Sequence, residues 1–319
     1  MVTPAITSPQ VLTPAQQTAD QARKSRRFWI IVALLTVYII WSTTYLAIRY
    51  ALISFPPQLM MGIRFIMAGG GLLIFLRLRG SAMPTLKQWR NALIVGGLLF
   101  TGGMGSVATA EEFVSSGLAA TLVAVVPLWA ILISMLWGHR PRATEWIGVL
   151  LGIAGVGVLT LEGNLQANPA GIGLMLFATL CWSLGSVWSK HLDMPTGAMA
   201  SASEMLAGGL LLVPLGLLGG EHIVGTPTIS ALLALAYLTT FGSLATISAY
   251  NYLLKTVRPS LATSYAFVNP AIALLLGVVL GGEHLTGSAF IALPLILVGV
   301  AFVALRRNAT TAEEAPQEA

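Results

Sequence analysis

Stretches of about 20 mostly apolar residues recur along the whole chain. A helix of this length crosses about 30 Å of hydrocarbon and satisfies its own backbone hydrogen bonds there. Only 9% of the 319 residues are charged, against about 25% in soluble domains, and the mean hydropathy is +0.82. The sequence therefore predicts an all-α integral membrane protein with ten transmembrane helices. The predicted spans are residues 28–48, 58–76, 91–110, 116–137, 146–161, 170–188, 197–218, 229–251, 260–280 and 288–305.

Positive charges collect on one side of these spans. Short loops of membrane proteins carry their Lys and Arg mainly on the cytoplasmic side. We therefore expect a multi-pass protein of the cytoplasmic (inner) membrane with both termini in the cytoplasm. The pI of about 9.6 then reflects topology, and no nucleic-acid partner is expected. The cations that define this side are Arg23, Lys24, Arg26, Arg27, Arg77, Arg79, Lys87, Arg90, Arg140, Arg142, Lys190, Lys255, Arg258, Arg306 and Arg307.

The segments outside the spans are short and polar. Residues 1–27 are rich in Pro, Thr, Ala and Gln, a composition that predicts a disordered cytoplasmic segment. Residues 306–319 are predicted to be a cytoplasmic tail.

The chain also repeats itself. "LAATLVAVVP" (118–127) aligns with "LATSYAFVNP" (261–270) at an offset of 143 residues, and "WS" at 41–42 aligns with "WS" at 182–183 at an offset of 141. The two copies, residues 28–161 and 170–305, hold five predicted spans each. Because five is odd, the second copy enters the membrane from the opposite side, which predicts two inverted repeats with a substrate site between them near the midplane.

Two charged residues, Arg64 and Glu204, lie within predicted spans at equivalent positions of the repeats. A charge near the bilayer centre costs from about 3 to more than 10 kcal/mol, so it is normally surrounded by protein or water. At 1.5 Å per residue, Arg64 lies about 10 Å below the outer surface and Glu204 about 10 Å above the inner one. The two side chains could pair directly, share a water-filled cavity, or each extend to its own interface.

Polar and aromatic residues near mid-depth are candidates for lining a cavity. Proline removes a backbone hydrogen bond, so Pro127 and Pro270 are predicted to kink their helices and free carbonyls toward a cavity. Glu111, at the outer end of the third span, is a candidate for collecting protons or cationic solutes. For each of these residues the alternative is an ordinary packing or surface role. The cavity candidates are Trp41, Ser42, Tyr45, Trp182, Ser183, Tyr265 and Asn269.

Sequence patterns of enzymes and metal sites are missing. The chain has no GxxxxGKS/T, HExxH or GxSxG pattern and no aspartate within a predicted span. The four histidines lie in predicted loops without metal-ligand spacing, and Cys181 is the single cysteine. We expect no enzymatic activity, no cofactor, no metal and no internal disulfide.

Several stretches carry a resemblance to a known family. They include "YIIWSTTYLAIRYAL" (38–52), "PPQLMMGIRFIMAGG" (56–70), "CWSLGSVWSK" (181–190) and "PSLATSYAFVNPAIALLLGVVLGGEHLTG" (259–287). With them the chain resembles EamA-type members of the drug/metabolite transporter superfamily over about residues 28–305. The resemblance implies ten helices in two EamA repeats around a central cavity, and transport of amino acids, other small metabolites or drugs, often outward.

Together these features predict a secondary transporter that exports amino acids or related small polar metabolites by alternating access. Arg64 would hold a carboxylate or a structural charge, and Glu204 would balance it. One alternative is an exporter of lipophilic cations, and another is a membrane scaffold or sensor that transports nothing. Substrate identity, direction, coupling ion and oligomeric state stay open.

Overall fold

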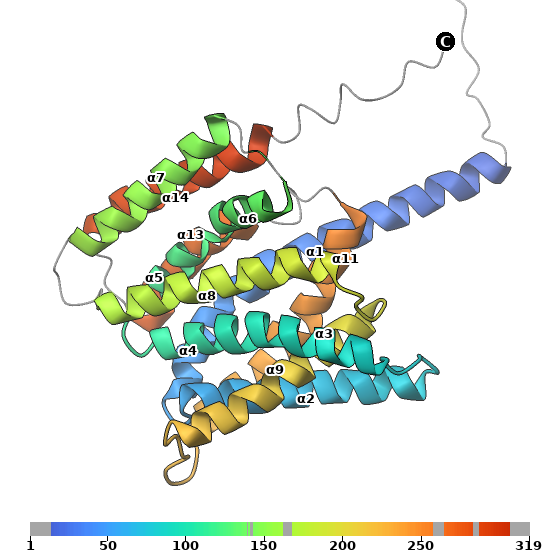
Figure 1. The fold of residues 1–319 in the computed structure, drawn as a ribbon, viewed down its shortest axis with the longest axis horizontal. Coiled ribbons are helices and arrows are strands. Elements are labelled where there is room, and N and C mark those ends of the chain that lie inside the picture. Colours follow the sequence, from blue (N-terminus) through green and yellow to red (C-terminus); the bar gives the residue numbers. More distant parts are fainter. Residues whose placement is uncertain are drawn as a thin grey trace, which may run out of the picture.

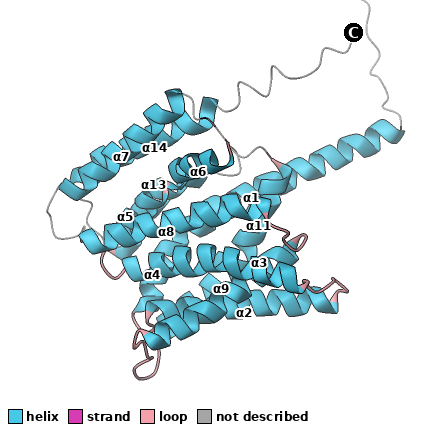
Figure 2. Cartoon of the chain, viewed as in Figure 1, coloured by secondary structure: helices cyan, strands magenta, loops and turns pink. Residues whose placement is uncertain are grey.

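The computed structural model describes residues 14–138, 140, 143–161, 168–257, 265–282 and 287–306. These residues form helices and loops without a strand, which confirms the all-α prediction (Figure 2). Several predictions fall outside the described residues. They are the disorder of residues 1–13, the tail from 307, the start of the ninth span (260–264) and most of "GGEHLTG" (283–286). The α-helices are α1 (Pro14–Leu52), α2 (Pro57–Leu78), α3 (Leu86–Gly96), α4 (Ser106–Ala110), α5 (Ser116–Val123), α6 (Val126–Ser134), α7 (Ala143–Leu161), α8 (Pro169–Trp188), α9 (Ala198–Leu218), α10 (Ile229–Tyr237), α11 (Thr246–Thr256), α13 (Tyr265–Gly281) and α14 (Gly287–Arg306). Two π-helical segments, η1 (Gly97–Gly105) and η4 (Leu238–Ala245), join α3 to α4 and α10 to α11, and the short 3-10 turns η2 (Met135–Trp137) and η3 (Ser189–His191) follow α6 and α8.

Seven helices in the described part of the chain are long and apolar enough to cross a membrane. Three shorter apolar helices, Ala143–Gly155, Val268–Leu280 and Phe290–Gly299, fall where the fifth, ninth and tenth spans are predicted. Large apolar side chains remain exposed along these helices, which is the arrangement expected of a surface solvated by lipid. Examples are Ile31, Leu35, Ile39, Ile74, Phe75, Leu210, Leu233 and Leu275.

The first helix begins earlier than predicted. α1 starts at Pro14, so the expectation of disorder up to residue 27 is corrected for residues 14–27. Ala, Gln, Lys and Arg are favourable helix formers, and extending an existing helix avoids the cost of nucleation. The Lys24 ammonium also lies 2.8 Å from the Asp20 carboxylate one turn earlier.

Helices α2 and α9 pack antiparallel along much of their length. A Cβ atom at Gly69 would lie 2.8 Å from the carbonyl oxygen of Ala202, and one at Gly209 would lie 3.1 Å from the carbonyl oxygen of Gly62. Gly69 and Gly209 are 140 residues apart, as are Gly62 and Ala202. The contact is therefore reciprocal, as in an interface between two copies related by a twofold axis.

Helices α7 and α14 repeat this arrangement at the opposite edge of the molecule (Figure 1). A Cβ atom at Gly155 would lie 3.0 Å from the Ala292 carbonyl oxygen, and one at Gly299 would lie 2.6 Å from the Gly148 carbonyl oxygen. Both related pairs are 144 residues apart. Small residues allow this close approach, and close packing matters in lipid because no hydrophobic force drives the helices together.

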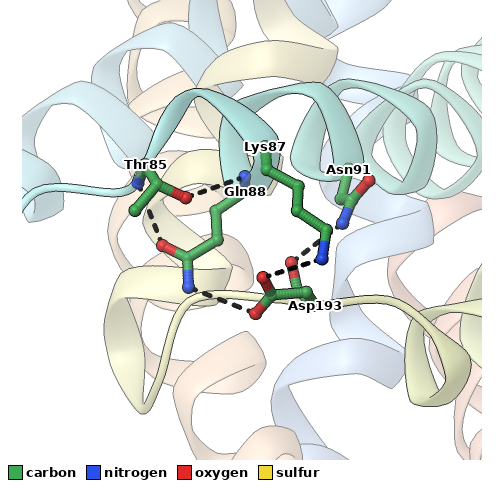
Figure 3. A network of polar contacts seen from close by, with 5 residues as sticks. All are labelled: Thr85, Lys87, Gln88, Asn91 and Asp193. Carbon is green, nitrogen blue, oxygen red and sulfur yellow. Dashed lines mark hydrogen bonds and ion pairs between the residues drawn. The ribbon is translucent and has the colours of Figure 1, made fainter.

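Polar contacts tie the loops at the two ends of the α2–α9 pair. At the end where α3 begins, Asp193 accepts from Gln88 (3.5 Å) and pairs with Lys87 (3.5 Å), and its carbonyl oxygen accepts from Asn91 (2.9 Å; Figure 3). Thr85 caps α3 through a capping box with Gln88.

The other end of the pair, where α10 begins, has a different set of contacts. The Ser54 and Thr228 hydroxyls lie 3.1 Å apart, and Thr228 caps α10. Glu221 accepts the backbone N–H groups of Gln58 (3.1 Å) and Leu59 (2.8 Å) at the start of α2. A carboxylate is favourable there because the N-terminus of a helix carries partial positive charge.

Candidate functional site

A cavity lies between the two halves of the chain, bordered by α1, η1, α4, the α5–α6 break, α8 and α13. Its volume is about 50 Å³ when counted as the space open to the centres of water-sized molecules. The first half contributes most of the wall and the second contributes α8 and the first residue of α13. The lining residues are Trp41, Thr44, Tyr45, Ile48, Gly103, Met104, Val107, Val123, Val126, Ala178, Thr179, Trp182 and Tyr265.

Aromatic side chains form one end of this cavity. The Trp41 ring meets Trp182 edge-on, with centroids 6.0 Å apart, and Tyr265 edge-on at 4.8 Å. Tyr250 of α11 packs against Trp41 at 5.2 Å from outside the lining set. The predicted candidates Trp41, Tyr45, Trp182 and Tyr265 are thus brought together on the cavity wall.

Two local features keep space open beside these rings. In η1, Gly103 lines the cavity without a side chain, and a Cβ atom there would be in ordinary van der Waals contact with Trp182 Cε3 at 3.4 Å. In the fourth predicted span, α5 ends at Val123 and α6 begins at Val126, with Pro127 next in the chain. The helix break thus lies at the cavity wall, and Ser183 donates to the Val126 carbonyl oxygen (2.9 Å). Pro270, by contrast, lies within α13, which runs as one helix from Tyr265.

Two of the predicted candidates lie behind the wall. Ser42 donates to the backbone carbonyl of Tyr38 within α1 and is fully buried. With its amide nitrogen turned toward the acceptors, Asn269 donates to Ser42 Oγ (3.2 Å) and to the Tyr38 carbonyl (3.3 Å). These residues join α13 to α1 and are not among the residues that line the cavity.

Arg64 also lies outside the cavity lining, buried completely between α2 and η4. Its Nε donates to Ser243 Oγ (2.8 Å), its Nη1 lies 3.5 Å from Met61 Sδ, and its Cζ is 4.9 Å from the centre of the Phe65 ring. Within the described residues its Nη2 has no hydrogen-bond partner.

Glu204 lies on α9 at a contact with α3, with 8% of its surface exposed. A Cβ atom at Gly96 would lie only 2.3 Å from the Glu204 carbonyl oxygen, so α3 passes very close to this turn of α9. The Arg64 guanidinium contacts Ser243, Met61 and Phe65, whereas Glu204 lies where α9 passes α3.

Glu111 ends α4 and is buried, with 5% of its surface exposed. The sequence places it at an interface with water, whereas the structure buries it. Its suggested part in coupling or uptake stays a prediction.

Glu112 is the next residue, lies outside the helices and is more exposed than the buried Glu111. Burial, and then the nearby charge of Glu221, raise the pKa of the Glu112 carboxyl. A raised pKa means that the folded state holds this proton more tightly, so the residue lowers stability as the pH rises through the unfolded and then the folded pKa. We expect Glu112→Gln to raise Tm at about pH 8 and to leave it unchanged near pH 4, where both states are largely protonated.

Thermal unfolding of the purified protein in detergent at the two pH values measures this effect. Glu221→Gln is the matched control, and it should lower Tm because Glu221 accepts two N–H groups at the start of α2. A Glu112→Gln variant with the same Tm as the wild type at about pH 8 would contradict the prediction.

The model of the EamA-like transporter family matches residues 27–161 and 169–305. The chain belongs to the EamA-like transporter family. It is 45% identical over 274 residues to the uncharacterized inner membrane transporter YedA of Escherichia coli K12, covering 86% of this chain and 90% of YedA. It is 28% identical over 268 residues to protein PecM of Dickeya dadantii, covering 81% and 88% of the two chains. The predicted resemblance to this family is confirmed.

A solved crystal structure shares the fold of this EamA-like transporter. Its TM-score is 0.62 at 24% sequence identity, with 88% of this chain and 98% of the other covered. At this identity the likeness shows the fold alone.

Some lining residues of this EamA-like transporter were not among the sequence candidates. Thr44 and Ile48 share a helix face with Trp41 and Tyr45, because residues three, four and seven apart lie on one side of a helix. That spacing from Trp41 could have found both. Thr179 and Met104 gave no comparable signal, since neither differs from ordinary residues of an apolar span.

Proposed function

We propose that this transporter is a secondary transporter of the cytoplasmic (inner) membrane that exports small solutes by alternating access through the cavity between its halves. The observation that carries the proposal is the cavity walled by Trp41, Tyr45, Trp182 and Tyr265. Ligand sites combine mostly apolar walls with a few polar groups, and the polar lining residues here include Thr44 and Thr179, whose hydroxyls donate to carbonyls of their own helices. Such a wall suits amino acids with apolar side chains and related metabolites.

Ten spans in two inverted repeats are part of this proposal. The reciprocal glycine contacts of α2 with α9 and of α7 with α14 support it, because they relate residues at nearly constant separations. The π-helical segments support it too, since Gly97 and Leu238 begin them 141 residues apart, the separation of the two "WS" pairs. A match of the family model to each half fits the same arrangement.

Alternating access needs contacts that form and break at the two ends of the molecule. The contacts of Asp193 and the Ser54–Thr228 contact lie at opposite ends of the α2–α9 pair. Asp193 binds the first turn of α3, which Thr85 caps, and Ser54 binds Thr228, which caps α10. Thr85 and Thr228 are 143 residues apart, so these are equivalent positions of the two copies. In this mechanism the two copies exchange their open and closed ends as they rock.

Export of lipophilic cations is the second candidate. It is favoured by the aromatic faces of Trp41 and Trp182 together with the absence of any Lys or Arg among the described lining residues. Aromatic rings attract organic cations, most strongly where water is excluded.

Counterflow in proteoliposomes tests the proposal. Vesicles are loaded in turn with unlabelled pools of apolar amino acids, polar amino acids, nucleosides, sugars and cationic drugs, and uptake of the matching labelled solute is followed. We expect transient accumulation with the apolar amino-acid pool, and protein-free vesicles serve as the control.

Accumulation with the cationic pool alone would select the second candidate. A monodisperse protein that shows no counterflow with any pool would contradict transport and favour a scaffold or sensor.

A further inference from the structure

The buried guanidinium of Arg64 lacks a counter-charge in the described structure. Its contacts are the Ser243 hydroxyl, the Met61 sulfur and the Phe65 ring, and all of these are uncharged. Buried polar groups almost always have hydrogen-bond partners, so the orphaned Nη2 needs an explanation. A cation enclosed in a membrane protein is kept where an anion or water can approach it.

The guanidinium is restrained on one side, and on the other its buried Nη2 has no hydrogen-bond partner. The bond from Nε to Ser243 and the Phe65 ring restrain the plane of the group. The donors that project past these restraints belong to Nη2. A restrained arginine that keeps free donors is pre-organised for a planar anion such as a carboxylate.

Nη2 lies next to the cavity wall. A Cβ atom at Gly242 would lie 3.1 Å from Arg64 Nη2 and 3.0 Å from Thr44 Cγ2, and Thr44 lines the cavity. The side chain of one threonine and the bare backbone of one glycine therefore separate the guanidinium from the aromatic chamber. Nη2 is itself buried, so a carboxylate reaches it only when Thr44 and the Gly242 segment move apart.

We propose that Arg64 forms a subsite for the anionic group of the transported solute, a carboxylate in the first instance, reached past Thr44 and Gly242. The apolar body of the solute then packs against Trp41 and Trp182. This inference rests on the proposed function and narrows its substrate class to solutes that carry both an apolar body and a carboxylate.

Binding of matched solute pairs tests this subsite without transport. The purified protein in nanodiscs is titrated with an apolar amino acid that exchanges in counterflow and with its amide, which lacks the carboxylate. We expect the wild type to bind the acid at least about tenfold more tightly than the amide, because a charge-assisted hydrogen bond is lost with the carboxylate. In Arg64→Met this preference should disappear while the affinity for the amide changes little, and Arg64→Lys should keep part of it.

A second variant covers the case in which Arg64→Met does not fold. Gly242→Ala places a methyl group 3.1 Å from Nη2 and should weaken binding of the acid about fivefold or more, with the amide unaffected. Gly71→Ala is the control, because a Cβ atom at Gly71 meets nothing within 4 Å. Equal loss of acid and amide in Gly242→Ala would overturn the proposal.

Chloride tests whether the anion bound at Arg64 is the carboxylate of the solute or an inorganic ion. Replacing sodium chloride by sucrose at the same osmolarity should raise the affinity for the acid and leave the amide unchanged if the carboxylate and chloride compete at Arg64. A parallel change for acid and amide would assign the site to an inorganic ion and overturn the proposal. Equal binding of acid and amide by the wild type would overturn the subsite while transport stands, whereas failure of both binding and counterflow would overturn both.

Discussion

Replacing Gly69 by valine is expected to lower the stability of the protein markedly, because it forces two closely packed helices apart. A Cβ atom at Gly69 would lie 2.4 Å from the backbone nitrogen of Leu206, 2.8 Å from the carbonyl oxygen of Ala202 and 2.9 Å from Met205 Cβ. None of these atoms can rotate away, so α2 and α9 must separate. Overpacking of this kind costs about 1–3 kcal/mol and more when backbone must move, and it should appear as a fall in Tm of the protein in detergent.

Gly71→Val provides the matched control. Gly71 lies on the same helix two residues later, and a Cβ atom there meets nothing within 4 Å. Its Tm should stay close to that of the wild type. Gly209→Val should lower Tm as much as Gly69→Val does, since Gly209 makes the reciprocal contact with Gly62 and Ile66. Similar Tm values for the Gly69 and Gly71 variants would show that the two helices do not approach as closely as described.

Much of the fold could be predicted from apolar length and internal repetition. Span boundaries follow from these signals because lipid requires long apolar helices with internally satisfied backbones. The early start of α1 at Pro14 is not predicted, since its polar composition indicates disorder although several of its residues favour helix. The π-helical segments η1 and η4 are not predicted either, because an extra residue per turn leaves no recognisable periodic signature in segments of only eight or nine residues.

The candidate site was predicted in part. Aromatic residues at mid-depth were expected to face a cavity, and four of them do. Arg64 was expected inside that cavity, and it lies behind the wall because its side chain reaches from α2 to Ser243 of η4. Sequence position gives the depth of a residue in the membrane. The direction in which it points depends on packing between the repeats, which a single sequence does not reveal.

The two prolines show the same limit. They occupy equivalent positions in "LAATLVAVVP" and "LATSYAFVNP", and the repeat predicts the same kink at both. The helix is interrupted between α5 and α6, just before Pro127, whereas α13 continues through Pro270. The helix is therefore interrupted beside the first proline and continuous through the second, a difference that the sequence repeat does not predict.

The second large effect is expected for Trp41→Ala. Trp41 is 7% exposed and packs against Trp182, Tyr250 and Tyr265, so its removal takes away the centre of the aromatic cluster. Truncation of a buried Trp costs about 3–5 kcal/mol, and aromatic pairs add about 0.5–1.5 kcal/mol each beyond buried area. We expect a clear fall in Tm and loss of at least about nine-tenths of counterflow, because the rings that would hold the solute lose their support.

Two further variants separate the cavity role of Trp41 from its contribution to stability. Trp41→Phe keeps a ring against its neighbours and should recover most of the Tm, so any remaining loss of counterflow reports on contact with the solute. Trp29→Ala, on the same helix but with 55% of its surface exposed, should keep both Tm and counterflow. If Trp41→Ala retained wild-type counterflow at a temperature where it stays folded, the aromatic cavity would not be the transport site, and the solute would have to cross between other helices of the bundle.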